Sequence, residues 1–81
     1  MKPIKQRVLT LLNQYGQGPD KMLLLPMLDR RLVMVEREKE YIGGRLVMLI
    51  REMIDEGLVL QGQGLHIGLT AQGQQALANA V

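Results

Sequence analysis

The chain has 81 residues and a net charge of +2. A chain of this length forms one small domain, which buries roughly 60–65% of the surface that its unfolded form exposes. A hydrophobic content of 47% is ample for a core and argues against disorder. The absence of Cys excludes a disulfide framework and a thiolate metal site. No apolar run approaches about 20 residues and no cationic leader precedes one, so we expect a soluble, cytoplasmic protein.

The charged residues are distributed unevenly along the chain. Residues 1–35 contain six Lys and Arg against two Asp, whereas residues 36–56 contain four Lys and Arg against six Asp and Glu. After Gly57, only His66 can carry a charge. Such blocks are typical of solvated faces. The alternative is a basic face directed at phosphates and an uncharged tail directed at another protein chain.

The first expected element is a helix from Pro3 to Tyr15. Proline suits the first helical turn, because its missing N–H would have no partner there. The apolar residues of this segment follow the spacing of one helical face: Ile4, Val8, Leu11, Leu12 and Tyr15. Gly16, Gly18 and Pro19 then end the helix.

Residues 20–25 are ambiguous, because the residue before Pro26 avoids helical geometry. We favour a short extended piece, followed by a second helix from Pro26 to about Val35. The alternative is one kinked helix from Lys21. Residues 36–40 alternate in charge sign and form either a solvated helix end or turn, or an extension of the second helix to Tyr41.

A third helix is expected from about Ile42 or Gly43 to Glu56, where Gly57 ends it. Its apolar residues fall on one side at 100° per residue: Leu46, Leu49, Ile50 and Met53. Leu58 to Leu60 and Leu65 to Leu69 then form a hairpin. Thr70 is expected to cap a last helix that runs to about Ala80, although Gly73 replaces the acid or amide of a full capping box.

This order of helix, glycine, strand, turn, strand and helix resembles the second half of a winged helix-turn-helix domain, as in MarR-type regulators of bacteria and phages. The resemblance covers residues 42–75 best. It rests on the spacing of Leu46, Ile50, Met53 and Gly57-Leu58-Val59, and on Leu69-Thr70-x-x-Gly73. It implies a mostly helical α+β fold over residues 1–81, with three helices, a two-stranded wing and a C-terminal helix. It also implies that the third helix enters the DNA major groove.

The third helix would then present Gly44, Met48 and Arg51 opposite its core side, with Arg45 at one edge. Arg45 and Arg51 have the donors that base edges require, and Met48 suits a thymine methyl or an apolar protein contact equally. Arg45 opposes the helix dipole and has no carboxylate three or four residues away, so it favours a partner outside the helix. Gly43 and Gly44 favour a sharp turn between helices with positive backbone angles, and they would also let a phosphate approach the helix N-terminus.

The main phosphate candidates lie on the first two helices, because the wing turn has no Lys or Arg. They are Arg30, Arg31, Lys2, Lys5 and Arg7. We therefore predict a small transcriptional regulator or accessory factor that binds double-stranded DNA. The uncharged, Ala-rich last helix suits close helix contact, within the domain or in a homodimer. The alternative is a protein-interaction module that uses Val47, Met48, Ile54 and the uncharged C-terminal half.

The sequence offers little support for an enzyme, a cofactor or a membrane partner. It has no Cys or Ser nucleophile, and Glu36, Glu38 and Glu40 follow a polar run that forms no pocket. His66 is the only histidine, so it makes a poor metal site. We predict no catalytic, cofactor-binding or metal-ligating residue.

Overall fold

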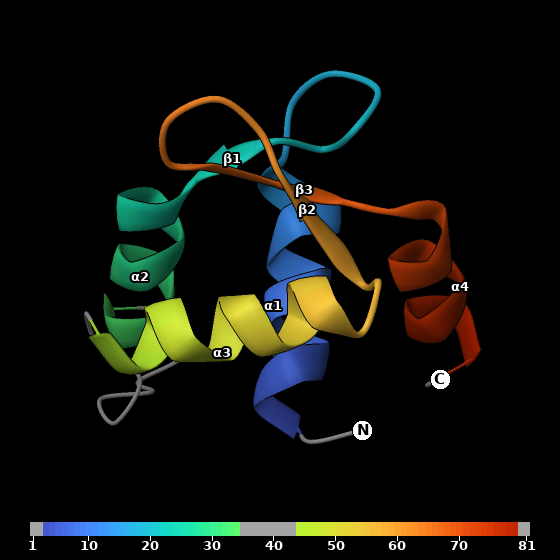
Figure 1. The fold of residues 1–81 in the computed structure, drawn as a ribbon, viewed down its shortest axis with the longest axis horizontal. Helices are drawn as coiled ribbons and strands as arrows, with labels where there is room; N and C mark the ends of the chain where they lie inside the picture. Colours follow the sequence, from blue (N-terminus) through green and yellow to red (C-terminus); the bar gives the residue numbers. More distant parts are fainter. Residues whose placement is uncertain (1–2, 35–43, 80–81) are drawn as a thin grey trace.

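The computed structural model describes residues 3–34 and 44–79, which form four helices and three strands (Figure 1). The elements in chain order are α1 Pro3–Tyr15, β1 Leu23–Leu24, α2 Leu25–Met34, α3 Gly44–Asp55, β2 Val59–Gln61, β3 His66–Leu69 and α4 Ala71–Asn79. Helices dominate and the strands form one small antiparallel sheet, so the predicted α+β class is confirmed.

The sheet has the strand order β1-β3-β2 and is antiparallel throughout. The β2–β3 hairpin confirms the expected strands to within one residue at each end. The extended piece before Pro26 is also confirmed, and the alternative of a kinked helix from Lys21 was wrong. β1 pairs with β3, with Leu23 opposite Ile67, so the sheet has three strands rather than the expected two.

A sharp turn between α1 and β1 makes this third strand possible. The Gln17 and Met22 backbones exchange hydrogen bonds of 2.8 Å in both directions, and Lys21 has a φ of 52°. The chain therefore reverses directly after α1. The Leu69 N–H donates to the Asp20 carbonyl at 2.7 Å, which ties this turn to the end of β3.

The core is built almost entirely from aliphatic side chains contributed by all three strands and by α1, α2 and α3. Its buried members are Ile4, Val8, Leu9, Leu11, Leu12, Leu23, Leu28, Leu32, Leu46, Leu49, Ile50, Met53, Leu58, Val59, Ile67 and Leu69. The four apolar residues that defined the core side of the third helix are all buried. Tyr15 is only partly buried and packs against the edge of this cluster.

Hydrogen bonds connect the C-terminal end of α3 to the N-terminal end of α4. Gly57 follows α3 with a φ of 79°, a conformation that favours glycine at a helix C-terminus. The Gly73 N–H donates to the Thr70 hydroxyl at 2.9 Å, which confirms the predicted cap. The same hydroxyl lies 2.6 Å from the Gly57 carbonyl and 2.9 Å from that of Leu58. Thr70 therefore joins the two helix ends.

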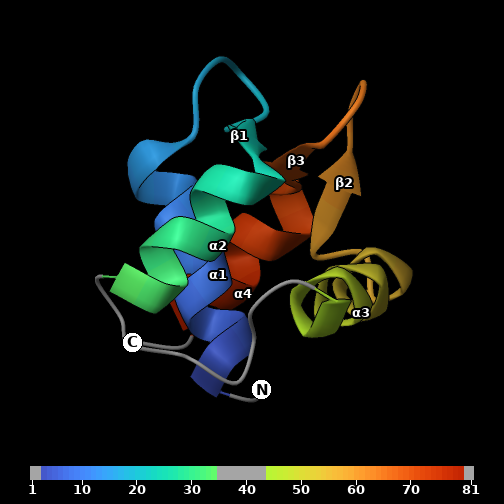
Figure 2. The same ribbon diagram turned by 90° about the vertical axis from the view of Figure 1, so that its left-hand side faces the viewer.

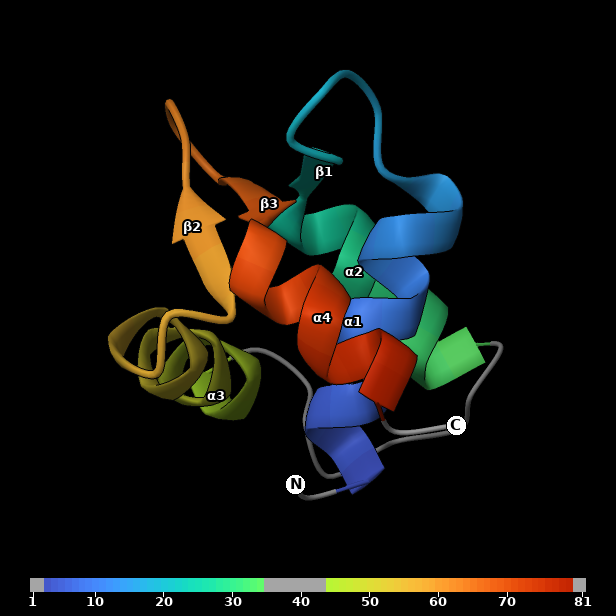
Figure 3. The same cartoon turned by 90° about the vertical axis from the view of Figure 1, so that its right-hand side faces the viewer.

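Figures 2 and 3 show α1, α2 and α4 gathered on one side of the molecule, with α3 and the hairpin on the other. Within the described part of the chain, no element covers the side of α3 that faces away from this cluster. The charge-alternating residues 36–40, the possible extension of the second helix to Tyr41, and Gly43 lie outside the described residues.

Candidate nucleic-acid interface

Three side chains form a row along the outer side of α3, which we call the outer row: Arg45, Met48 and Arg51. All three are exposed, and Met48 has 73% of its surface accessible. Neither arginine has a hydrogen bond or ion pair with another described residue. The structure thus brings together three of the predicted site residues, and Gly44 begins the same helix.

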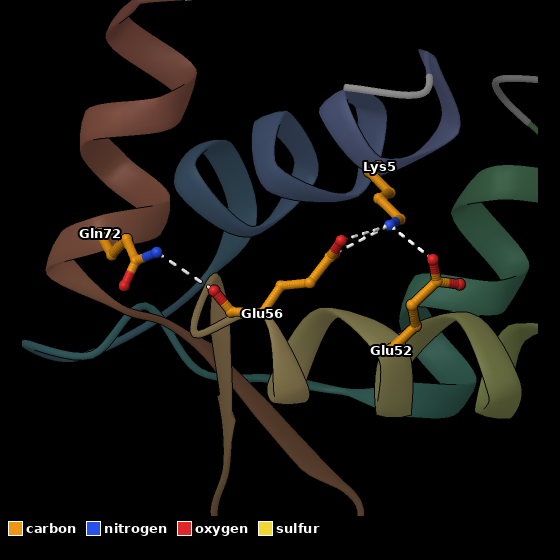
Figure 4. A network of polar contacts seen from close by, with 4 residues as sticks. All are labelled: Lys5, Glu52, Glu56 and Gln72. Carbon is orange, nitrogen blue, oxygen red and sulfur yellow. Dashed lines mark hydrogen bonds and ion pairs between the residues drawn. The ribbon is translucent and has the colours of Figure 1, made fainter.

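Lys5 lies inside the protein rather than on its surface. Its ammonium donates to Glu52 Oε1 at 2.8 Å and to Glu56 Oε1 and Oε2 at 2.8 and 2.9 Å (Figure 4). Only 6% of the Lys5 side chain is exposed, against 49% and 44% for the two glutamates. The hydrogen bonds that Lys5 donates, first to Glu52 and then to Glu56, stabilise its charged form and raise the pKa of Lys5 above its ordinary value. The prediction that Lys5 holds a phosphate is therefore corrected, because its donors are already engaged.

This ion-pair cluster, which we call the Lys5 clamp, also changes the charge of α3 as seen from outside. Glu52 and Glu56 point toward Lys5 of α1, whose single ammonium offsets one of their two negative charges (Figure 4). Gln72 of α4 adds a hydrogen bond of 3.1 Å to the Glu56 carbonyl. The outer side of α3 is left with two arginines and Asp55 as its charged groups.

The predicted phosphate contacts on α2 lie in different surroundings. Arg30 is exposed, whereas the Arg31 guanidinium stacks over the Tyr15 ring at 3.8 Å from its centroid. Arg31 also lines a hollow of about 280 Å³ together with Tyr15 and His66.

Arg7, the predicted phosphate contact on α1, faces away from α3. It is two residues after Lys5 and therefore about 200° around α1 from it.

An apolar groove separates α3 from the hairpin, and sequence reasoning missed it. The groove encloses about 220 Å³ and is lined by Leu25, Val47, Ile50, Arg51, Ile54, Gln61, Leu65 and Ile67. Leu65 was expected to begin the second strand of the hairpin, but it precedes β3 and is 53% exposed. The Gly62 N–H donates to the His66 carbonyl at 2.8 Å, and this hydrogen bond closes a turn that contains Leu65.

The turn also accounts for His66. This residue is exposed and the next one, Ile67, is buried, in keeping with the alternation of side chains along a strand, and the His66 Nδ1 lies 3.0 Å from the Gln63 carbonyl. Among residues 3–34 and 44–79, no three His, Asp or Glu side chains gather as metal ligands would. No helix in these ranges has the length and apolar character needed to cross a membrane.

Comparison with known proteins gives no family for this chain. No family model, curated protein or solved structure matches it.

Proposed function

We propose that this chain is a winged helix-turn-helix domain that binds double-stranded DNA through α3. The element order and the strand order β1-β3-β2 support a winged-helix architecture, with β2 and β3 as the wing. The position of α3 beside the hairpin, on the side away from α1, α2 and α4, supports its use as the groove-binding helix (Figures 2 and 3).

The observation that carries the DNA proposal is the composition of the outer row. Arg45 and Arg51 are exposed and have no carboxylate partner among the described residues. The two glutamates that would repel phosphates are held by Lys5 instead. Guanidinium groups in this position can neutralise phosphates or donate two hydrogen bonds to guanine. Arg30 is a further phosphate contact in this proposal.

A homodimer acting as a small transcriptional regulator or accessory factor fits the rest of the surface. The exposed residues of α4 are uncharged, which lowers the cost of covering the helix with a second copy. A two-fold dimer would present two copies of α3 and double the number of arginines available to one duplex.

The test is the affinity of Arg45→Ala and Arg51→Ala for a labelled duplex, measured by fluorescence anisotropy. Arg7→Ala is the matched control, because it removes the same charge from an exposed residue turned away from α3. We expect each α3 variant to bind several-fold more weakly with an unchanged melting temperature. Equal affinities for the two α3 variants, the control and the wild type would refute the proposal.

A second candidate function is protein binding, which the groove beside α3 favours. Val47, Met48 and Leu65 are exposed apolar residues at this groove or next to it. Salt separates the two candidates, since phosphate neutralisation makes affinity fall steeply with ionic strength and an apolar contact does not. A Met48→Glu variant would weaken both kinds of binding, so Arg45→Ala is the more selective probe.

A further inference from the structure

Met48 occupies the centre of the outer row and has no role in the core. It lies three residues after Arg45 and three before Arg51, on the side of α3 opposite the buried Leu46, Leu49, Ile50 and Met53. With 73% of its surface exposed, it is the most accessible large apolar side chain in the described part of the chain. A surface that covers the outer side of α3 can therefore contact this thioether.

The spacing of the outer row lies between one and two base-pair steps. Three residues advance an α-helix by about 4.5 Å, and base pairs rise by about 3.4 Å. Adjacent members of the row therefore reach base pairs one or two steps apart. In the major groove, the one apolar group on a base edge is the C5-methyl of thymine, whereas guanine offers the acceptors that arginine prefers.

We propose that Met48 is a specificity-determining residue that contacts the C5-methyl of a thymine, in a short segment whose flanking G·C pairs are read by Arg45 and Arg51. The inference rests on the proposed DNA-binding function and adds the kind of sequence that α3 selects. A flexible, polarisable side chain suits this contact, because it can adjust to the methyl without a fixed hydrogen-bond geometry.

The experiment begins with selection of bound sequences from a randomised duplex library by the wild-type protein. The best sequence is then made again with deoxyuridine in place of each thymine in turn, which removes only the methyl group. We expect enrichment of thymine flanked by guanine and about fourfold weaker binding when that thymine becomes deoxyuridine, the effect of burying one methyl group.

Two variants assign the effect to the side chain. Met48→Ala should bind the thymine and deoxyuridine duplexes equally. Met27→Ala makes the same change at an exposed methionine of α2 and should keep the fourfold difference. Both residues are exposed, so neither change removes core packing.

The outcomes separate the inference from the function on which it rests. Binding without thymine enrichment, equal affinity of the wild type for both duplexes, or a difference that persists in Met48→Ala would overturn the inference and leave DNA binding intact. An absence of binding to any library duplex at low salt would overturn the proposed function, and the inference with it.

Discussion

Replacing Lys5 by Met should destabilise the protein, although methionine is an apolar residue of similar length and the Lys5 side chain is buried. The substitution keeps most of the buried stem and removes the ammonium that donates to Glu52 and Glu56. Breaking a fully buried ion pair costs about 3–5 kcal/mol, and an exposed pair contributes about 0.2–1 kcal/mol. The Lys5 side chain is buried but both glutamates are about half exposed and can regain water.

The cost should therefore lie between these limits, at about 2 kcal/mol of unfolding free energy, or roughly 8–16 °C in melting temperature. Urea denaturation followed by circular dichroism measures it. Arg7→Met is the control on the same helix and should change stability by no more than about 1 kcal/mol. In a Glu56→Gln background, Lys5→Met should cost less than in the wild type. A Lys5→Met midpoint equal to that of the wild type would refute the clamp.

Three further effects follow from the same contacts. Because the pKa of Lys5 is raised from 10.5, the stability difference between wild type and Lys5→Met should hold below pH 10.5 and shrink above it, as seen in urea titrations across that range. Gly73→Ala should lose about 1–3 kcal/mol of unfolding free energy although alanine has the better helix propensity, because the added methyl meets the Leu58 carbonyl. An unchanged urea midpoint would contradict this packing. Thr70→Ala should lose about 1 kcal/mol of unfolding free energy and Thr70→Ser much less, since only serine keeps the capping hydroxyl. Equal losses of the two variants in thermal melting would contradict a capping role for the hydroxyl.

The helices could be predicted from sequence because their information is local. In α3, four apolar residues spaced by three or four positions define one side, and each of them is buried. The Thr70 cap was predictable for the same reason, since donor and acceptor are three residues apart. The extended residues before Pro26 were predicted from the steric restriction that proline imposes on its neighbour, but that neighbour, Leu25, begins α2, and the extended residues are Leu23 and Leu24.

The Lys5 clamp could not be predicted, because its partners lie 47 and 51 residues away in the chain. A weak signal was present: Leu9 and Leu12 follow Lys5 by four and seven positions, which places the lysine on the buried stripe of α1. This pattern predicts that Lys5 is buried, but it does not identify the acidic residues that pair with it. The pairing of β1 with β3 is non-local in the same way, because the sequence of a two-residue strand does not indicate which strand it pairs with.

The candidate site was partly predictable. The outer side of α3 follows from its core side by helical geometry alone, so Arg45, Met48 and Arg51 could be found from sequence. The groove could not, because it depends on the hairpin turn that leaves Leu65 outside β3, where it lines the groove together with Val47.

The most direct test of the central claim is the anisotropy of a labelled random-sequence duplex titrated with the wild-type protein at about 50 and 200 mM salt. Binding through α3 and its arginines predicts micromolar affinity at the lower salt and a steep loss at the higher. No binding at the lower salt would contradict the claim, and would direct attention to a protein partner for the groove beside α3.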